Sequence, residues 1–229
     1  MGEASMQPPH DAVAWGIPSH NEPRWRALLA VAVAIALQVV LPERVIRGLG
    51  SRWLIPALEV TLLLVLLFAN PGRISKEERH LRIIGVSLIA LISVANVVTL
   101  LELINALLYG SKASGRPLIY ASLPIWLTNV IAFGLWYWEL DRGGPAERQL
   151  PEHPRPDFLF PQMSAPGSSP GWVPSLLDYL YTSFTNATAF SPTDTMPLTA
   201  WAKLLMSLQA MASLVTVAVV ISRAVNILS

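Results

Sequence analysis

Long apolar runs alternate with polar connections along this chain. Five of these runs are long enough to predict transmembrane helices, each of which needs about 20 predominantly apolar residues. They are Trp25 to Leu41, Trp53 to Ala69, Ile83 to Tyr109, Leu118 to Leu140 and Ala200 to Leu228. The pattern therefore predicts an all-α, polytopic membrane protein with about five transmembrane helices.

Composition supports this fold class. The 229 residues are 53% hydrophobic and 14% charged, with a mean hydropathy of +0.48, whereas soluble domains are usually about 25% charged. The chain has no cysteine, which excludes disulfides, thiolate nucleophiles and cysteine-bound metals. A net charge of +1 offers no basic face for nucleic acid. The expected partner is the lipid bilayer.

The polar connections divide the chain into four parts. Residues 1–24 form a polar N-terminal tail, and residues 25–140 form a four-helix transmembrane region. Residues 141–171 are predicted to be a Pro/Gly-rich extramembrane loop, because the stretch from Asp141 to Pro174 holds eight prolines and several charges. Residues 172–229 hold an amphipathic segment and the last transmembrane helix.

The segment from Trp172 to Pro197 is too polar to cross a membrane in one pass. It carries two aspartates and a run of hydroxyl residues, and Pro192 would end a helix. We therefore expect a re-entrant, pore-helix-like element: a short helix followed by an extended return to the same side. Such irregular backbone is tolerated at membrane depth only where protein buries it or where it lines water.

This segment, DYLYTSFTNATAFSPTDTMP, resembles the pore domain of tetrameric potassium channels. The family pattern D-x-L-Y-x-S-x-x-T-x-T-T-V-G-Y-G-D-x-x-P aligns with it without a gap. The matching positions are Asp178, Leu180, Tyr181, Ser183, Thr188, Asp194 and Pro197. The resemblance covers about 50 residues and implies a homo-oligomer, which is a tetramer if the protein is channel-like.

The selectivity filter of that family is missing. Ala189, Phe190, Ser191, Pro192 and Thr193 stand at its position, so both filter glycines are absent. Glycines allow the left-handed backbone that aims successive carbonyls at the ion, and Pro192 restricts Ser191 to extended geometry. A potassium-type filter is not expected. The pore or vestibule residues would be Thr185, Asn186, Thr188, Ser191, Pro192, Thr193 and Asp194; alternatively, they only satisfy the backbone of a buried turn.

The whole chain also resembles an uncharacterised bacterial family with about five transmembrane helices. Its members carry a phrase like D-F-x-F-P before the pore-like segment, here Asp157 to Pro161. This resemblance implies the architecture and a multi-pass location in the plasma or inner membrane. It implies no activity.

Several polar side chains lie within the apolar runs. They are Glu59 in the second run and Asn96, Thr99, Glu102 and Asn105 along one flank of the third. An intramembrane carboxylate is a candidate ion site or proton relay. The structural alternatives are that Glu102 lies beyond the hydrocarbon or bonds another helix, and that Glu59 pairs with an interfacial arginine.

Two functions remain open from the sequence. The first is an ion-channel-like membrane protein that conducts with poor selectivity; the second is a non-conducting membrane protein that uses the same fold as a structural, lipid-binding or partner-binding module. The four histidines share no metal-ligand spacing, and no nucleophile and base are paired, so we expect no metal, no cofactor and no enzyme.

Orientation follows from the charges beside the helix ends. Arg44, Arg47, Arg52, Lys112 and Arg116 lie in short connections. Short basic loops favour the cytoplasmic side, which places the N-terminus outside and the C-terminus inside. The basic connection from Arg73 to Arg82 argues for the opposite orientation.

Overall fold

The computed structural model describes residues 23–41, 53–69, 79–109, 115–150, 154–164, 171–188 and 194–228. This part of the chain is mostly helical. Its five long helices are α2 (Trp25–Val39), α3 (Leu54–Ala69), α4 (Arg79–Tyr109), α5 (Gly115–Leu140) and α8 (Ala200–Leu228). Their bounds lie within a few residues of the apolar runs in the sequence, which confirms these helices.

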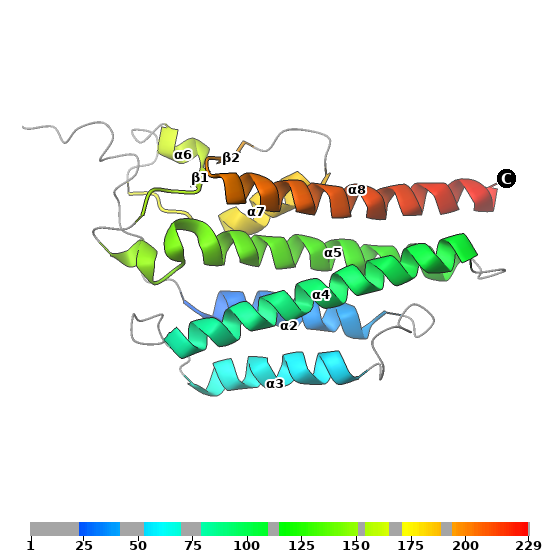
Figure 1. The fold of residues 1–229 in the computed structure, drawn as a ribbon, viewed down its shortest axis with the longest axis horizontal. Helices are drawn as coiled ribbons and strands as arrows, with labels where there is room; N and C mark the ends of the chain where they lie inside the picture. The colour runs from blue at the N-terminus through cyan, green and yellow to red at the C-terminus, as the bar shows by residue number, and fades with distance from the viewer. Residues whose placement is uncertain are drawn as a thin grey trace, which may run out of the picture.

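The long helices lie side by side, and α5 is central among them (Figure 1). On one side α5 contacts α2 and α4, with α3 beyond them. On the other side it contacts α8 and the short helix α7 (Leu176–Thr188). Most contacts between the two sets of neighbours therefore run through α5, although α4 and α8 also touch each other directly.

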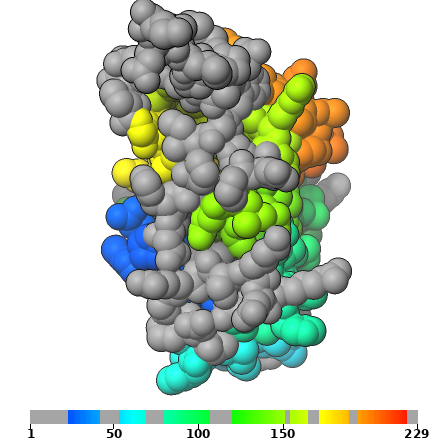
Figure 2. Space-filling view, turned by 90° about the vertical axis from the view of Figure 1, so that its left-hand side faces the viewer, coloured from blue at the N-terminus to red at the C-terminus, as the bar shows by residue number. Residues whose placement is uncertain are grey.

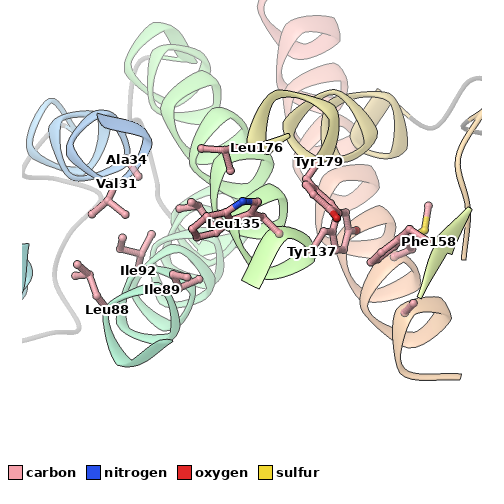
Figure 3. Close-up of a cluster of buried hydrophobic side chains, with 14 of the residues drawn as sticks. Val31, Ala34, Leu88, Ile89, Ile92, Leu135, Tyr137, Phe158, Leu176 and Tyr179 are labelled. Carbon is pink, nitrogen blue, oxygen red and sulfur yellow. The ribbon is translucent and has the colours of Figure 1, made fainter. Parts of the chain in front are cut away.

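Apolar side chains fill both sides of α5 (Figure 3). Leu135 points toward α2 and α4, where it meets Val31 and Ile89. Tyr137 points the other way, toward Tyr179 of α7 and Phe158.

The outer helix surfaces are apolar as well. Among the described residues, two helical stretches are long and apolar enough to cross a membrane: His80–Ala106 and Ala200–Ser222. Only 39% and 22% of them, respectively, is buried inside the protein. The core helix of a soluble protein would be mostly buried, so the exposed apolar faces fit a membrane protein.

The segment after α5 is folded rather than a plain loop. It contains the 3₁₀ turns η2 (Asp141–Gly143) and η3 (Glu147–Gln149), strand β1 (Phe158–Leu159) and helix α6 (Pro161–Ser164). Strand β2 (Met196–Pro197) pairs antiparallel with β1, with Phe158 opposite Pro197. Figure 2 shows this end of the molecule, where the start of the segment lies between α2 and the beginning of α8.

Candidate functional site

Helix α7 is the helical part of the pore-like segment, of which residues 189–193 lie outside the described chain, and it is wedged between α5 and α8. Its 13 residues reach about 20 Å at 1.5 Å per residue, which is shorter than a bilayer core of about 30 Å. Gly134 of α5 permits the close approach: a Cβ at this position would lie 2.7 Å from Cδ2 of Leu180 and 3.1 Å from its Cα. Any larger residue would push α7 away from α5.

A buried hydrogen-bond network centred on Gln209 of α8 holds α7 in place. The Gln209 side chain is fully buried. Its Oε1 accepts hydrogen bonds from Tyr137 OH (2.5 Å) and Asn186 Nδ2 (2.8 Å). Its Nε2 donates to the carbonyl oxygen and Oγ of Ser183, at 2.9 and 2.6 Å. One side chain thereby joins α5, α7 and α8.

Two serines extend this network. Ser183 Oγ of α7 donates to the carbonyl of Val130 on α5 at 2.6 Å. Ser213 Oγ of α8 donates to the carbonyl of Ala187, and it accepts a hydrogen bond from Trp126 Nε1 at 2.7 Å. Ala187 lies in the last turn of α7, where backbone carbonyls have no partner within the helix. The network therefore also provides a hydrogen-bond partner for a carbonyl at the buried C-terminal end of α7.

A buried charge cluster fixes the other end of α7. Asp141, fully buried at the end of α5, accepts hydrogen bonds from Tyr179 OH (2.5 Å) and the backbone N–H of Asp157 (2.8 Å). Its Oδ2 also lies 3.6 Å from Nε of Arg142, whose side chain is 3% exposed. A buried carboxylate is tolerated where such partners replace water.

Asp157 joins the connecting segment to α8. Its carboxylate accepts hydrogen bonds from the backbone N–H of Arg142 (2.9 Å) and from Trp201 Nε1 (3.0 Å), and its carbonyl accepts from Leu198 N–H (2.8 Å). The first contact supports a left-handed backbone at Arg142 (φ 54°), which is strained for a residue with a side chain. Next to Asp157, the ring of Phe158 lies 6.0 Å from that of Trp201.

Arg148 caps the C-terminus of α5. Its Nη1 donates to the carbonyls of Trp138 (2.5 Å) and Asp141 (3.1 Å), the kind of helix-end oxygens that a cation stabilises. The guanidinium carbon also lies 5.3 Å from the ring centre of Tyr179, within cation–π range. The end of α5 and the start of α7 thus share one buried cation.

The first turn of α7 carries a capping box, S-x-x-D. The carboxylate of Asp178 accepts hydrogen bonds from the backbone N–H (2.8 Å) and Oγ (2.7 Å) of Ser175. We expect Asp178→Ala to lower the free energy of unfolding by about 1 kcal/mol, the usual cost of a lost cap. Asp178→Asn, which keeps an acceptor oxygen, is the matched control. Thermal unfolding in detergent measures both, and an unchanged melting temperature for Asp178→Ala would contradict the cap.

The predicted vestibule residues occupy different environments. Thr185 Oγ1 donates to the carbonyls of Tyr181 and Thr182, and Thr188 Oγ1 donates to that of Thr185. Both hydroxyls therefore bond to the backbone of α7 itself. Asn186 lies in the Gln209 network, and Asp194 is exposed. Ser191, Pro192 and Thr193 lie outside the described residues.

The predicted intramembrane polar residues do not form one site. Glu59 is fully buried and accepts a hydrogen bond from Gln38 Nε2 of α2 at 3.3 Å. Asn96 and Thr99 are buried, Glu102 is half-buried and Asn105 is exposed. Thr99 Oγ1 bonds the carbonyl of Ala95 within its own helix.

Sequence reasoning missed the two clusters that hold α7. Gln209, Ser213 and Thr216 follow an i, i+4, i+7 spacing in an apolar helix, and this one-sided polar stripe is the signal that could have revealed the first. Tyr137, near the end of α5, is also buried in that network. The second, the charge cluster around Asp141, joins residues that are far apart in the sequence, so no local pattern reveals it.

Within the described residues, no group of three His, Asp or Glu side chains could hold a metal ion. The site instead combines a short helix, a buried hydrogen-bond network and a buried ion pair, which makes it suited to holding α7 rigidly between α5 and α8. In comparisons with known proteins, no family model, no curated protein and no solved structure matches the chain.

Proposed function

We propose that this chain is a multi-pass, ion-channel-like membrane protein. Helices α2, α3, α4, α5 and α8 span the bilayer, and α7 enters and leaves on one side. The apolar outer faces support this placement, as do the lengths of α4, α5 and α8, at about 46, 39 and 44 Å for 31, 26 and 29 residues. One observation carries the proposal: α7, which is 13 residues long and rich in polar side chains, unlike the apolar α2 and α3 of 15 and 16 residues, is wedged between α5 and α8 by buried polar contacts.

The assembly we propose is a tetramer around an axis beside α7 and α8. Both helices expose apolar side chains at helical spacing. These are Leu177, Tyr181 and Phe184 on α7 and Leu204, Leu208, Met211 and Val215 on α8. Neighbouring subunits would cover these stripes. Without filter glycines, the side chains near Asp194 would set a poorly selective cation path.

A non-conducting membrane protein is the second candidate, and a specific observation favours it. Thr185 and Thr188 bond their own helix, while Asn186 faces α8. These polar groups are thereby engaged within one chain, as in a sealed structural element. On this alternative, the purified protein has no shared axis and no cation flux.

Oligomer mass and flux together separate the two functions. We expect a tetramer in nanodiscs and cation leak from proteoliposomes. Met211, 65% exposed on α8, should be an interface residue, so Met211→Trp should break the tetramer. The matched control is Val94→Trp on α4, where 57% exposure is to lipid and a larger side chain is accommodated.

A monomer that supports no flux would eliminate the channel and favour the second candidate. If the Met211→Trp variant remained a tetramer, the subunit interface would not include this face of α8. The readouts are mass by light scattering in nanodiscs and potassium and sodium flux in the same preparations.

A further inference from the structure

A cavity lies on the far side of α5 from α7. This cavity of about 380 Å³ is enclosed by α2, α3, α4, the end of α5 and the turn η3. Its walls are mainly apolar, with Val31, Leu66, Leu88 and Leu135 contributed by the four helices. The volume falls in the range of small-ligand sites, about 300–1,000 Å³.

The charged lining residues gather at one end. Arg24 and Arg82 stand at the starts of α2 and α4, and Glu139 and Glu147 stand at the end of α5 and in η3. The apolar lining extends from the charges to Val31 and Ile89, which lie seven residues, about 10 Å along the helix, beyond Arg24 and Arg82. The cavity is therefore amphiphilic, with an ionic rim and an apolar interior.

Gly85 of α4 creates part of this space. A Cβ built on Gly85 would have no atom within 4 Å, although the residue lines the cavity. Glycines in membrane helices usually allow a neighbouring backbone to come close, as Gly134 does for α7. No neighbour comes close at Gly85, so helix packing does not require the missing side chain.

We propose that this cavity binds one acyl chain of a phospholipid whose headgroup carries both a phosphate and a primary ammonium. The inference rests on the membrane placement proposed above, and it is independent of conduction and of oligomeric state. The apolar walls take the chain, the arginines of the rim take the phosphate, and Glu147 takes the ammonium, because the Glu139 side chain is only 10% exposed and is paired with Arg82.

The rim charges select the headgroup class. Two arginines and two glutamates sum to zero, which matches a zwitterion better than an anionic lipid. Arg82 Nε bonds Glu139 Oε1 at 2.8 Å, yet the Arg82 side chain remains 45% exposed. A guanidinium carries five N–H donors and suits phosphate geometry, so this pairing leaves donors for a phosphate.

Photolabelling in nanodiscs tests the proposal. The probe is a phosphatidylethanolamine with a diazirine in one acyl chain, and cross-links are mapped by mass spectrometry. We expect labels on Val31 and Ile89 in the wild-type protein. Gly85→Leu fills the cavity and should reduce these labels several-fold, while Gly85→Ala, which adds one methyl group, should keep them. Leu66→Trp, which fills the cavity from α3, should act as Gly85→Leu does.

The headgroup is tested by competition. An excess of unlabelled phosphatidylethanolamine should suppress the labels, whereas the same excess of unlabelled phosphatidylglycerol should not. Unchanged labels in both filled variants, or equal competition by the two lipids, would overturn the inference while leaving the membrane placement intact. Extraction of the chain from membranes by alkaline carbonate would instead refute that placement, and this inference with it.

Discussion

Replacing Asp141 with alanine should lower the free energy of unfolding by about 3–5 kcal/mol, the usual cost of breaking a buried ion pair. Asp141 is fully buried and binds Tyr179 OH and the backbone of Asp157, with Arg142 at 3.6 Å. Its loss leaves the Arg142 charge buried without this carboxylate, and it frees the start of α7. Unfolding in detergent, followed by circular dichroism, measures the effect.

Two variants locate the cause. Tyr179→Phe removes one hydrogen bond and keeps the ion pair, so it should cost only about 1 kcal/mol. Asp194→Ala removes an exposed aspartate and should leave the unfolding curve unchanged. If Asp141→Ala behaved like Asp194→Ala, the cluster would not stabilise this end of the protein.

Replacing Gln209 with leucine should lower the free energy of unfolding by about 2 kcal/mol, because an unsatisfied buried polar group costs about 1–3 kcal/mol. The change removes the hydrogen bonds that Tyr137, Asn186 and Ser183 make with the Gln209 side chain. Hydrogen bonds between membrane helices average about 0.6 kcal/mol, so several must be lost to reach this effect. Thermal unfolding and protease accessibility around α7 provide the readouts.

Ser207→Ala is the matched control on α8. Ser207 is exposed and its Oγ bonds only the carbonyl of Lys203 in the same helix. We expect it to unfold like the wild type. Equal stability of Gln209→Leu and Ser207→Ala would show that the network does not hold α7 between its neighbours.

The long helices could be predicted from the sequence because their signal is local. Apolar runs ended by Pro42 and by Asn70-Pro71-Gly72 located the helices to within a few residues. The short helix before the last one was equally readable, since Asp178 and its hydroxyl-rich surroundings rule out a full span. These features depend on residues that are close together in the chain.

The clusters that hold α7 could not be predicted in the same way. Asp141, Arg142 and Arg148 lie in a stretch rich in proline and charge, where solvated side chains are the usual interpretation. Their burial depends on Tyr179, 38 residues beyond Asp141. The motif that begins at Asp157 was recognised in the sequence. That Asp157 links Arg142 to Trp201 could be seen only in the folded structure.

The charge cluster also has a consequence for the proposed function. It binds the segment after α5 to both the start of α7 and the start of α8, through Tyr179 and Trp201. A movement of that segment would therefore move α7. If the protein conducts ions as proposed, a change in the segment after α5 would reach the ion path beside α7 through these contacts.

A cryo-EM map of the protein in lipid nanodiscs tests the central claim most directly. The account predicts four copies around one axis, with α7 ending inside the bilayer between α5 and α8 and with its apolar stripe covered by a neighbouring subunit. A map in which α7 lies flat on the membrane surface, or faces lipid in an isolated monomer, would contradict it.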